Sequence, residues 1–463
     1  MDAKAPERIR LSEKLGYGIG DLPSGLYLNF FAAYLLYFFV DLGGVAPAAM
    51  ALMLLLSRVF DAITDPVMGL ISDRTRTRWG RYRPYLLFGA IPYGITGFLI
   101  FSAPEMSPGW LLVWAYATYG VTMLAFTAVN VPYGGLLGVI SPSATQRANV
   151  TAYRMFFSGL SGILVGVLAT TLIRELGAGD EARGVMLTMA VFAAVSVVCY
   201  LITFATTQER IPPSPTNNSV RGDLGNLVRT GAWVALAVSS VFGVLAIASR
   251  ASSARFYYKY VVGDDGAPVF LFLDRFGLFL TALALGQVSG VVIGYLLQNR
   301  FEKSHLIISG GFLKGAGILA FWLMPIDAVW GQTLAQLFVG IGFGFLMVLA
   351  FSMFTDIAEF IDWKFGKPMT ALTLAASVFA VKVGAGLGSA LPGLVLEWNG
   401  FDPGAAQSAE AIAGINAAFA VIPGLILIPA GIAMLFYRLD HATIARIERD
   451  LSVRRTAAAG SGE

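Results

Sequence analysis

Twelve apolar stretches dominate the chain, and they are long enough to cross a membrane as helices. A transmembrane helix needs about 20 mostly apolar residues to span a hydrocarbon core roughly 30 Å thick. Lipid offers the backbone no hydrogen-bond partners, so such stretches fold as helices. We therefore expect an all-α membrane protein with spans near residues 16–40, 46–72, 85–103, 109–140, 152–173, 185–206, 232–260, 268–298, 306–325, 329–358, 369–397 and 411–437.

Composition supports the membrane assignment and narrows the classes of function. Of the 463 residues, 56% are hydrophobic and 13% are charged, whereas about a quarter of a soluble domain is charged. One cysteine and two histidines are too few for a disulfide framework or a histidine metal cluster. We expect no enzyme activity, no cofactor and no metal other than a coupling Na+. The net charge of +3 gives no reason to expect a nucleic-acid partner.

The distribution of Lys and Arg predicts the orientation and the domains. Both are concentrated near the N-terminus and in loops after even-numbered stretches, which places both termini in the cytoplasm. A polar loop rich in Pro, Ser and Asn lies midway along the chain. We expect a six-helix bundle over 1–206, a cytoplasmic linker over 207–231, a second bundle over 232–437 and a cytoplasmic tail over 438–463. "GLISDR" at 69–74 and "GYLLQNR" at 294–300 are a faint repeat between the bundles.

Two carboxylates interrupt the second apolar stretch. Asp61 and Asp65 are four residues apart and share one helix face, beside Thr64. A charge at bilayer depth costs about 2.5–3.5 kcal/mol on insertion scales, so these acids need a cation. The cation could be Arg58, one turn earlier, as a structural lock. Alternatively, hard oxygen donors suit Na+, and two crowded acids can hold H+.

Several motifs resemble the glycoside-pentoside-hexuronide:cation symporters of the major facilitator superfamily, which include the melibiose permease. They are "GYGIGD" at 16–21, "RVFDAITDPVMGLISDRTRTRWGRYRPY" at 58–85, "NVPYGGLLGVIS" at 130–141, "TAYRMFF" at 151–157 and "FTDIAEFIDWKFGK" at 354–367. The resemblance implies two pseudo-symmetric six-helix bundles around a cavity that opens alternately to each side. It also implies a bacterial cytoplasmic (inner) membrane protein, which we expect to be a monomer.

The resemblance places the coupling cation at Asp61 and Asp65, with Thr64 nearby. Asn130 stands where the melibiose permease has a third acid, so the site here is less negative. The choice between Na+ and H+ therefore stays open.

Buried bases mark the expected substrate region. The resemblance places Arg154 at a sugar-contacting position and Lys382 near the cavity, although each could instead form a permanent salt bridge to an acid such as Asp21. Family contacts are missing at Ser24, Gly25, Gly134 and Met347, so the galactoside pocket is not kept. The groups that could bind hydroxyls instead are Asp21, Tyr17, Asn29 and Tyr133.

The resemblance also implies gating residues, in the loop motif after the second span and at the end of the tenth. Asp73 and Arg74 are the candidate latch, and Asp356 and Glu359 are candidates for a corresponding closure.

Together these features predict cation-coupled symport of a sugar or glycoside, with Na+ or H+, by alternating access. The partners would be a small solute and the lipid bilayer. Two alternatives stay open: coupled transport of an amphiphile such as a lysophospholipid, with a base for its phosphate, and cation-independent uniport.

Overall fold

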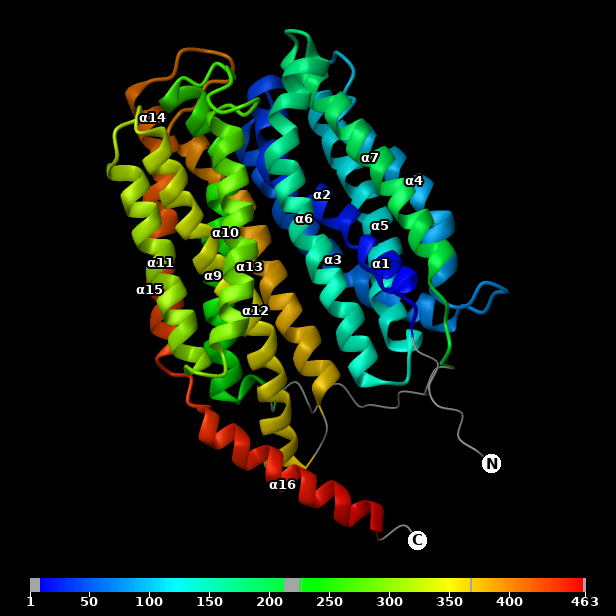
Figure 1. Cartoon of the computed structure of the whole chain (residues 1–463). Helices are drawn as coiled ribbons and strands as arrows, with labels where there is room; N and C mark the ends of the chain where they lie inside the picture. Colours follow the sequence, from blue (N-terminus) through cyan, green and yellow to red (C-terminus); the bar gives the residue numbers. More distant parts are fainter. Residues whose placement is uncertain (1–8, 212–224, 226, 367–368, 461–463) are drawn as a thin grey trace. The chain divides into compact units, whose positions relative to one another are not determined.

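The computed structural model describes residues 9–211, 225, 227–366 and 369–460 (Figure 1). Twelve described helical segments are long and apolar enough to cross a membrane, which confirms the predicted spans. Residues 212–224 of the predicted linker lie outside the described residues, and the predicted tail contains a helix. The described helices are α1 (Leu11–Ile19), α2 (Leu22–Tyr37), η1 (Phe38–Leu42), α3 (Pro47–Arg74), α4 (Arg83–Phe101), α5 (Pro108–Ile140), α6 (Ala144–Gly177), α7 (Glu181–Thr206), α9 (Gly231–Tyr257), η2 (Tyr258–Val262), α10 (Arg275–Leu297), α11 (Lys303–Leu323), α12 (Val329–Phe365), α13 (Thr370–Trp398), α14 (Ala409–Asn416), η3 (Ala417–Val421), α15 (Ile422–Met434) and α16 (His441–Gly460).

Close contacts divide the structure into two compact units. Among the described residues, unit 1 contains 9–211, 251–284 and 389–418, and unit 2 contains 225, 227–250, 285–366, 369–388 and 419–460. The division cuts through α9, α10 and α13, so it does not follow the chain order. The predicted bundles over 1–206 and 232–437 therefore stay a prediction.

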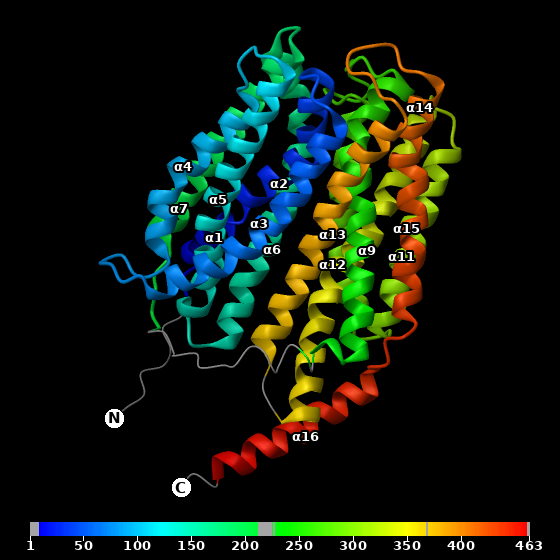
Figure 2. The ribbon, with the colours of Figure 1, turned by 180° about the vertical axis from the view of Figure 1, so that it is seen from behind.

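In unit 1, the first helices pack through aromatic rings and close helix contacts. α4 lies along both α5 and α7 (Figure 2). Phe30 of α2 meets Phe101 of α4 and Phe192 of α7 edge to face, with ring centroids 5.5 Å apart in both pairs. This arrangement suits the ring quadrupoles, and it holds α2 against α4 and α7.

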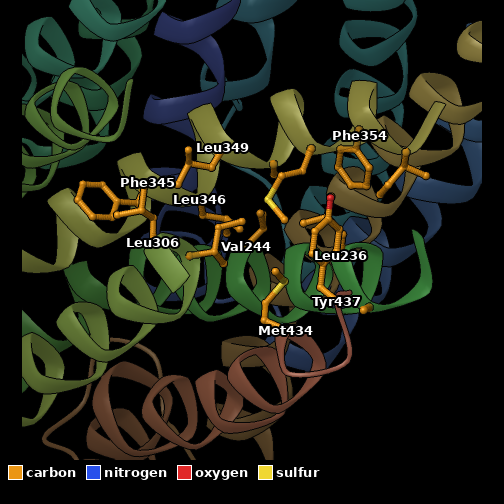
Figure 3. Packing of buried hydrophobic residues seen from close by; sticks show 14 of the residues in the cluster. Leu236, Val244, Leu306, Phe345, Leu346, Leu349, Phe354, Met434 and Tyr437 are labelled. Carbon is orange, nitrogen blue, oxygen red and sulfur yellow. The ribbon is translucent and has the colours of Figure 1, made fainter. Parts of the chain in front are cut away.

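In unit 2, one side of α12 is the centre of the apolar core (Figure 3). Leu346, Leu349 and Met353 follow one another at helical spacing and are buried. They pack in one cluster with Leu236 and Val244 of α9. A continuous apolar stripe of this kind is what the 3.6-residue period of a helix presents to its neighbours.

Glycines let α10 and α12 approach each other closely. A Cβ added at Gly290 would lie 2.2 Å from the carbonyl oxygen of Ile341, and one at Gly344 would lie 2.3 Å from that of Gln287. Backbone atoms cannot move aside as a flexible side chain can, so only glycine fits. Small residues allow this kind of close packing between membrane helices.

The close approach predicts a position-specific cost for an added methyl group. Gly290→Ala should destabilise the protein by about 1–3 kcal/mol, because overpacking forces the two backbones apart. The matched control is Gly315→Ala on α11, where an added Cβ meets nothing within 4 Å. This control should be neutral or stabilising by up to about 1 kcal/mol, since alanine favours helix. Thermal unfolding in detergent measures both, and equal midpoints for the two variants would contradict the packing argument.

Candidate functional site

The first acid of the predicted cation site forms an ion pair within its own helix. Asp61 is buried on α3, and its Oδ2 lies 3.2 Å from Nη1 of Arg58. Arg58 also donates a hydrogen bond from Nη2 to the Tyr119 hydroxyl on α5, at 3.3 Å. Arg58 therefore forms the ion pair with Asp61 that the sequence suggested, and its hydrogen bond to Tyr119 joins α3 to α5.

The second acid faces the same neighbouring helix. The Thr127 hydroxyl of α5 donates to Oδ1 of Asp65 at 3.0 Å. Asp61 and Asp65 are one turn apart, so both acids lie on the side of α3 that faces α5. Sequence reasoning missed Thr127. The available signal was its position three residues before Asn130, one turn away on the same helix.

The two other predicted cation ligands have different contacts. The Thr64 hydroxyl donates to the Phe60 carbonyl oxygen of its own helix at 3.0 Å. Asn130 accepts a hydrogen bond from Ser24 of α2, and its amide nitrogen lies 3.5 Å from the Tyr200 hydroxyl of α7. Within the described ranges, no group of three or more His, Cys, Asp or Glu side chains is arranged to hold a metal ion. A cation on α3 would therefore rest on two carboxylates and the hydroxyl of Thr127.

Four of the six predicted substrate residues form one cluster in unit 1. Nε of Arg154 on α6 lies 2.9 Å from Oδ1 of Asp21, which directly precedes α2. The rings of Tyr17 and Tyr133 stack with centroids 4.7 Å apart, and the Arg154 guanidinium lies 5.2 Å from the Tyr133 ring centroid. The two tyrosines also exchange hydrogen bonds, each donating its hydroxyl to the other's carbonyl oxygen. The cluster therefore combines an ion pair with an aromatic face.

The remaining two predicted substrate residues lie outside this cluster. Asn29 is exposed on α2, and its side-chain amide donates to the Gly25 carbonyl oxygen at 2.7 Å. Lys382 is half-buried on α13 in unit 2.

The arginine-rich loop is held by acids from two directions. Asp73 lies 3.7 Å from Nη1 of Arg81 and accepts a hydrogen bond from the Tyr82 hydroxyl at 2.7 Å. Burial and this hydrogen bond raise the pKa of Tyr82 above its usual value, so the phenol stays a donor. Arg74, the last residue of α3, is exposed.

Glu209 is an anchor of this loop that the sequence did not reveal. Its carboxylate accepts the backbone N–H groups of Arg81, Tyr82 and Arg83 where α4 begins. A carboxylate at a helix N-terminus satisfies free N–H groups and complements the helix dipole. The partner lies far away in the chain, so spacing alone could not indicate it.

The predicted closure residues on α12 lie in unit 2. Oδ2 of Asp356 is 2.6 Å from Nζ of Lys303, the first residue of α11. Glu359 is half-buried three residues further along α12. The Asp356–Lys303 pair thus ties α12 to the start of α11 inside this unit.

Comparison with known proteins gives a consistent family. The family model described as MFS/sugar transport protein matches residues 16–441. The inner membrane symporter YicJ of Escherichia coli is 30% identical over 448 residues, covering 96% of each chain. The isoprimeverose transporter of Lactiplantibacillus pentosus is 30% identical and covers 93% of this chain and 89% of its own.

Solved structures share the fold. A D-xylose-proton symporter superimposes with a TM-score of 0.66 at 14% identity, covering 92% of this chain and 96% of its own. A bacterial homologue of the lysosomal transporter Spinster gives a TM-score of 0.67 at 16% identity, covering 94% of this chain and 98% of its own. These identities support the fold alone, whereas the family match covers nearly the whole chain and confirms the resemblance seen in the motifs. The chain therefore belongs to the MFS/sugar transport protein family, and it is an integral membrane transporter and not an enzyme.

Proposed function

We propose that this chain is a cation-coupled symporter of a sugar or glycoside that works by alternating access. The observation that carries the proposal is the pair Asp61 and Asp65 on one face of α3, with the Thr127 hydroxyl against Asp65. Carboxylates at bilayer depth are costly, so a transporter keeps them where a cation neutralises them. Two carboxylates and a hydroxyl are the oxygen donors that Na+ prefers, and the same pair can share a proton.

The cluster around Arg154 is the proposed solute site. A sugar offers many hydroxyl groups and an apolar ring face. Asp21 and Arg154 supply an acceptor and a donor, and the adjoining tyrosines supply ring surface. Some relatives are named as transporters of sugars or glycosides: one is an isoprimeverose transporter, and another, from Escherichia coli, is a putative glycoside/cation symporter. These names favour a sugar over an amphiphile here.

We place the protein in a bacterial inner membrane with both termini in the cytoplasm. The described residues contain twelve candidate spans, and an even number supports placing both termini on the same side. The loop between α3 and α4 contains five arginines, counted from Arg74 to Arg83, and such an excess stays on the cytoplasmic side.

A uniporter is the second candidate, because of Arg58. Its guanidinium already lies 3.2 Å from Asp61 and could serve as a permanent countercharge. In that case Asp61 and Asp65 would hold α3 in place, and no cation would be carried with the solute. Variants of Asp65 separate the two functions, since Arg58 pairs directly with Asp61.

Asp65→Asn should abolish accumulation against a gradient, because it removes charge from the cation site at almost constant volume. Proteoliposome uptake under an imposed Na+ or H+ gradient should fall by about tenfold or more. Downhill transport of the solute along its own gradient should continue. Glu105→Gln removes an exposed loop carboxylate and is the control for charge loss alone. Accumulation at the wild-type level by Asp65→Asn would favour the uniporter.

Asp21→Asn should weaken solute binding more than cation dependence. The change leaves the Arg154 guanidinium without its ionic partner at 2.9 Å, which disturbs the solute cluster directly. We expect the apparent KM for uptake to rise about tenfold, equivalent to roughly 1.4 kcal/mol of binding free energy. Uptake kinetics at several Na+ concentrations measure this. An unchanged KM combined with lost Na+ dependence would place Asp21 in the coupling site instead.

A further inference from the structure

Two neighbouring helices of unit 2 keep exposed apolar stripes. α11 and α15 pack against each other, and they lie side by side in both views of the ribbon (Figure 1, Figure 2). Leu425, Ile428 and Ile432 follow one another at helical spacing on α15, and each is more than half exposed. Phe312 and Leu319 of α11 are likewise more than half exposed. In a membrane protein, the acyl chains of lipids cover an apolar surface of this kind.

Large exposed side chains continue both stripes to the point where α15 ends and α11 begins. Leu435 and Phe436 directly follow α15, and they are 69% and 65% exposed. Phe301 lies two residues before α11 and is 54% exposed. These side chains extend the apolar surface to the ends of the two spans, where the lipid headgroups begin.

Two arginines stand directly beyond these apolar side chains. Arg300 precedes Phe301, and Arg438 follows Phe436 by two residues. Both arginines are exposed, and neither forms an ion pair or a side-chain hydrogen bond with any residue that the structure describes. A planar guanidinium can donate two parallel hydrogen bonds to a phosphate. These two arginines are therefore available for a phosphate-bearing ligand from outside the protein.

A hydrogen bond between two connecting segments brings the arginines near each other. His441 donates its backbone N–H to Oε2 of Glu302 at 3.1 Å. Arg300 lies two residues before Glu302. Arg438 lies three residues before His441. A chain extends by at most about 3.6 Å per residue, so both arginine backbones lie within about 11 Å of this bond. One lipid headgroup can therefore lie within reach of both side chains.

The acids in this region are already engaged at the start of α16. Glu302 accepts the backbone N–H of His441, and Asp440 accepts that of Thr443 at 2.8 Å. The positive end of the helix dipole offsets negative charge at this position. The two carboxylates therefore leave the positive charge of the arginines largely uncompensated.

We propose that Arg300 and Arg438 hold the phosphate of an anionic phospholipid whose acyl chains lie along α11 and α15. Basic sites between membrane helices on the cytoplasmic side bind anionic headgroups in this way. This lipid site is independent of the transported solute and of the coupling ion. It rests only on the placement of this end of unit 2 at the cytoplasmic surface. The bound lipid ties the connection between α10 and α11 to the end of α15, and so stabilises unit 2.

Binding of defined lipids to the purified full-length protein tests the site. We expect phosphatidylglycerol to raise the thermal unfolding midpoint in mild detergent, and native mass spectrometry gives its apparent dissociation constant. Arg300→Gln and Arg438→Gln should each weaken phosphatidylglycerol binding by about fivefold, and the double variant by about twentyfold or more, because each arginine attracts the anionic headgroup separately. Phosphatidylcholine has acyl chains but no net charge, and it should bind the wild type about tenfold more weakly than phosphatidylglycerol does.

Free phosphate and a distant arginine provide the controls. Inorganic phosphate at the same concentration should not shift the unfolding midpoint, because it has no acyl chains. Arg76→Gln removes an exposed arginine from the loop between α3 and α4 in unit 1, and it should leave phosphatidylglycerol binding unchanged. Arg300 and Arg438 are exposed, so the variants should unfold at the wild-type midpoint when no lipid is added.

Three results would overturn the lipid site. The first is wild-type phosphatidylglycerol affinity in the double variant. The second is an equal loss of affinity in Arg76→Gln, since the attraction would then be general to the cytoplasmic surface. The third is stabilisation by inorganic phosphate alone, which would indicate an adventitious ion only. These measurements require no transport, so a failure of coupled uptake would count against symport and not against the lipid site.

Discussion

The rest of the structure depends on the need to neutralise charged side chains inside the bilayer, and the ion pair between Arg58 and Asp61 is one example. A charge inside a bilayer needs a partner, and the partner must come from the protein or from a ligand. Arg58 meets this need for Asp61 and reaches α5 through Tyr119. Asp65 accepts a hydrogen bond from the Thr127 hydroxyl of α5. The polar groups of α3 thus fix this helix against α5, and any bound cation must act on that same contact.

Other buried charges in the chain follow the same rule with different partners. Glu13 and Arg210 form a bidentate pair at 2.7 and 2.8 Å that joins α1 to the segment after α7. Arg250 in unit 2 is almost fully buried, and it donates to the Gln336 side chain and the Phe419 carbonyl oxygen. Its guanidinium also lies 4.0 Å from the Phe419 ring centroid. Neutral acceptors and an aromatic face can therefore hold an arginine that must stay charged.

The sequence predicts the spans well and the tertiary partners poorly, for a physical reason. Transfer of apolar side chains into lipid depends on local composition, so the hydropathy of the chain identifies all twelve spans. Asp61 and Asp65 stand out because a charge in an apolar run is visible by itself. Thr127 and Glu209 do not, since a threonine in a helix or an acid in a loop is ordinary until its partner is known. Arg250 lies in an apolar run and could have been identified by the reasoning that found Arg154.

Under the proposed symport mechanism, a cation bound at Asp61 and Asp65 organises the site for solute. By linkage, cation and solute must then raise each other's affinity by the same factor. The direct measurement is calorimetric titration of the purified protein with a glycoside chosen by thermal-shift screening, at saturating and vanishing Na+ and at acidic and alkaline pH. The account predicts a clear loss of solute affinity when the coupling ion is withdrawn, and no such loss in Asp61→Asn. Equal affinity for the wild type under all these conditions would show that the carboxylates are structural and that symport is the wrong mechanism.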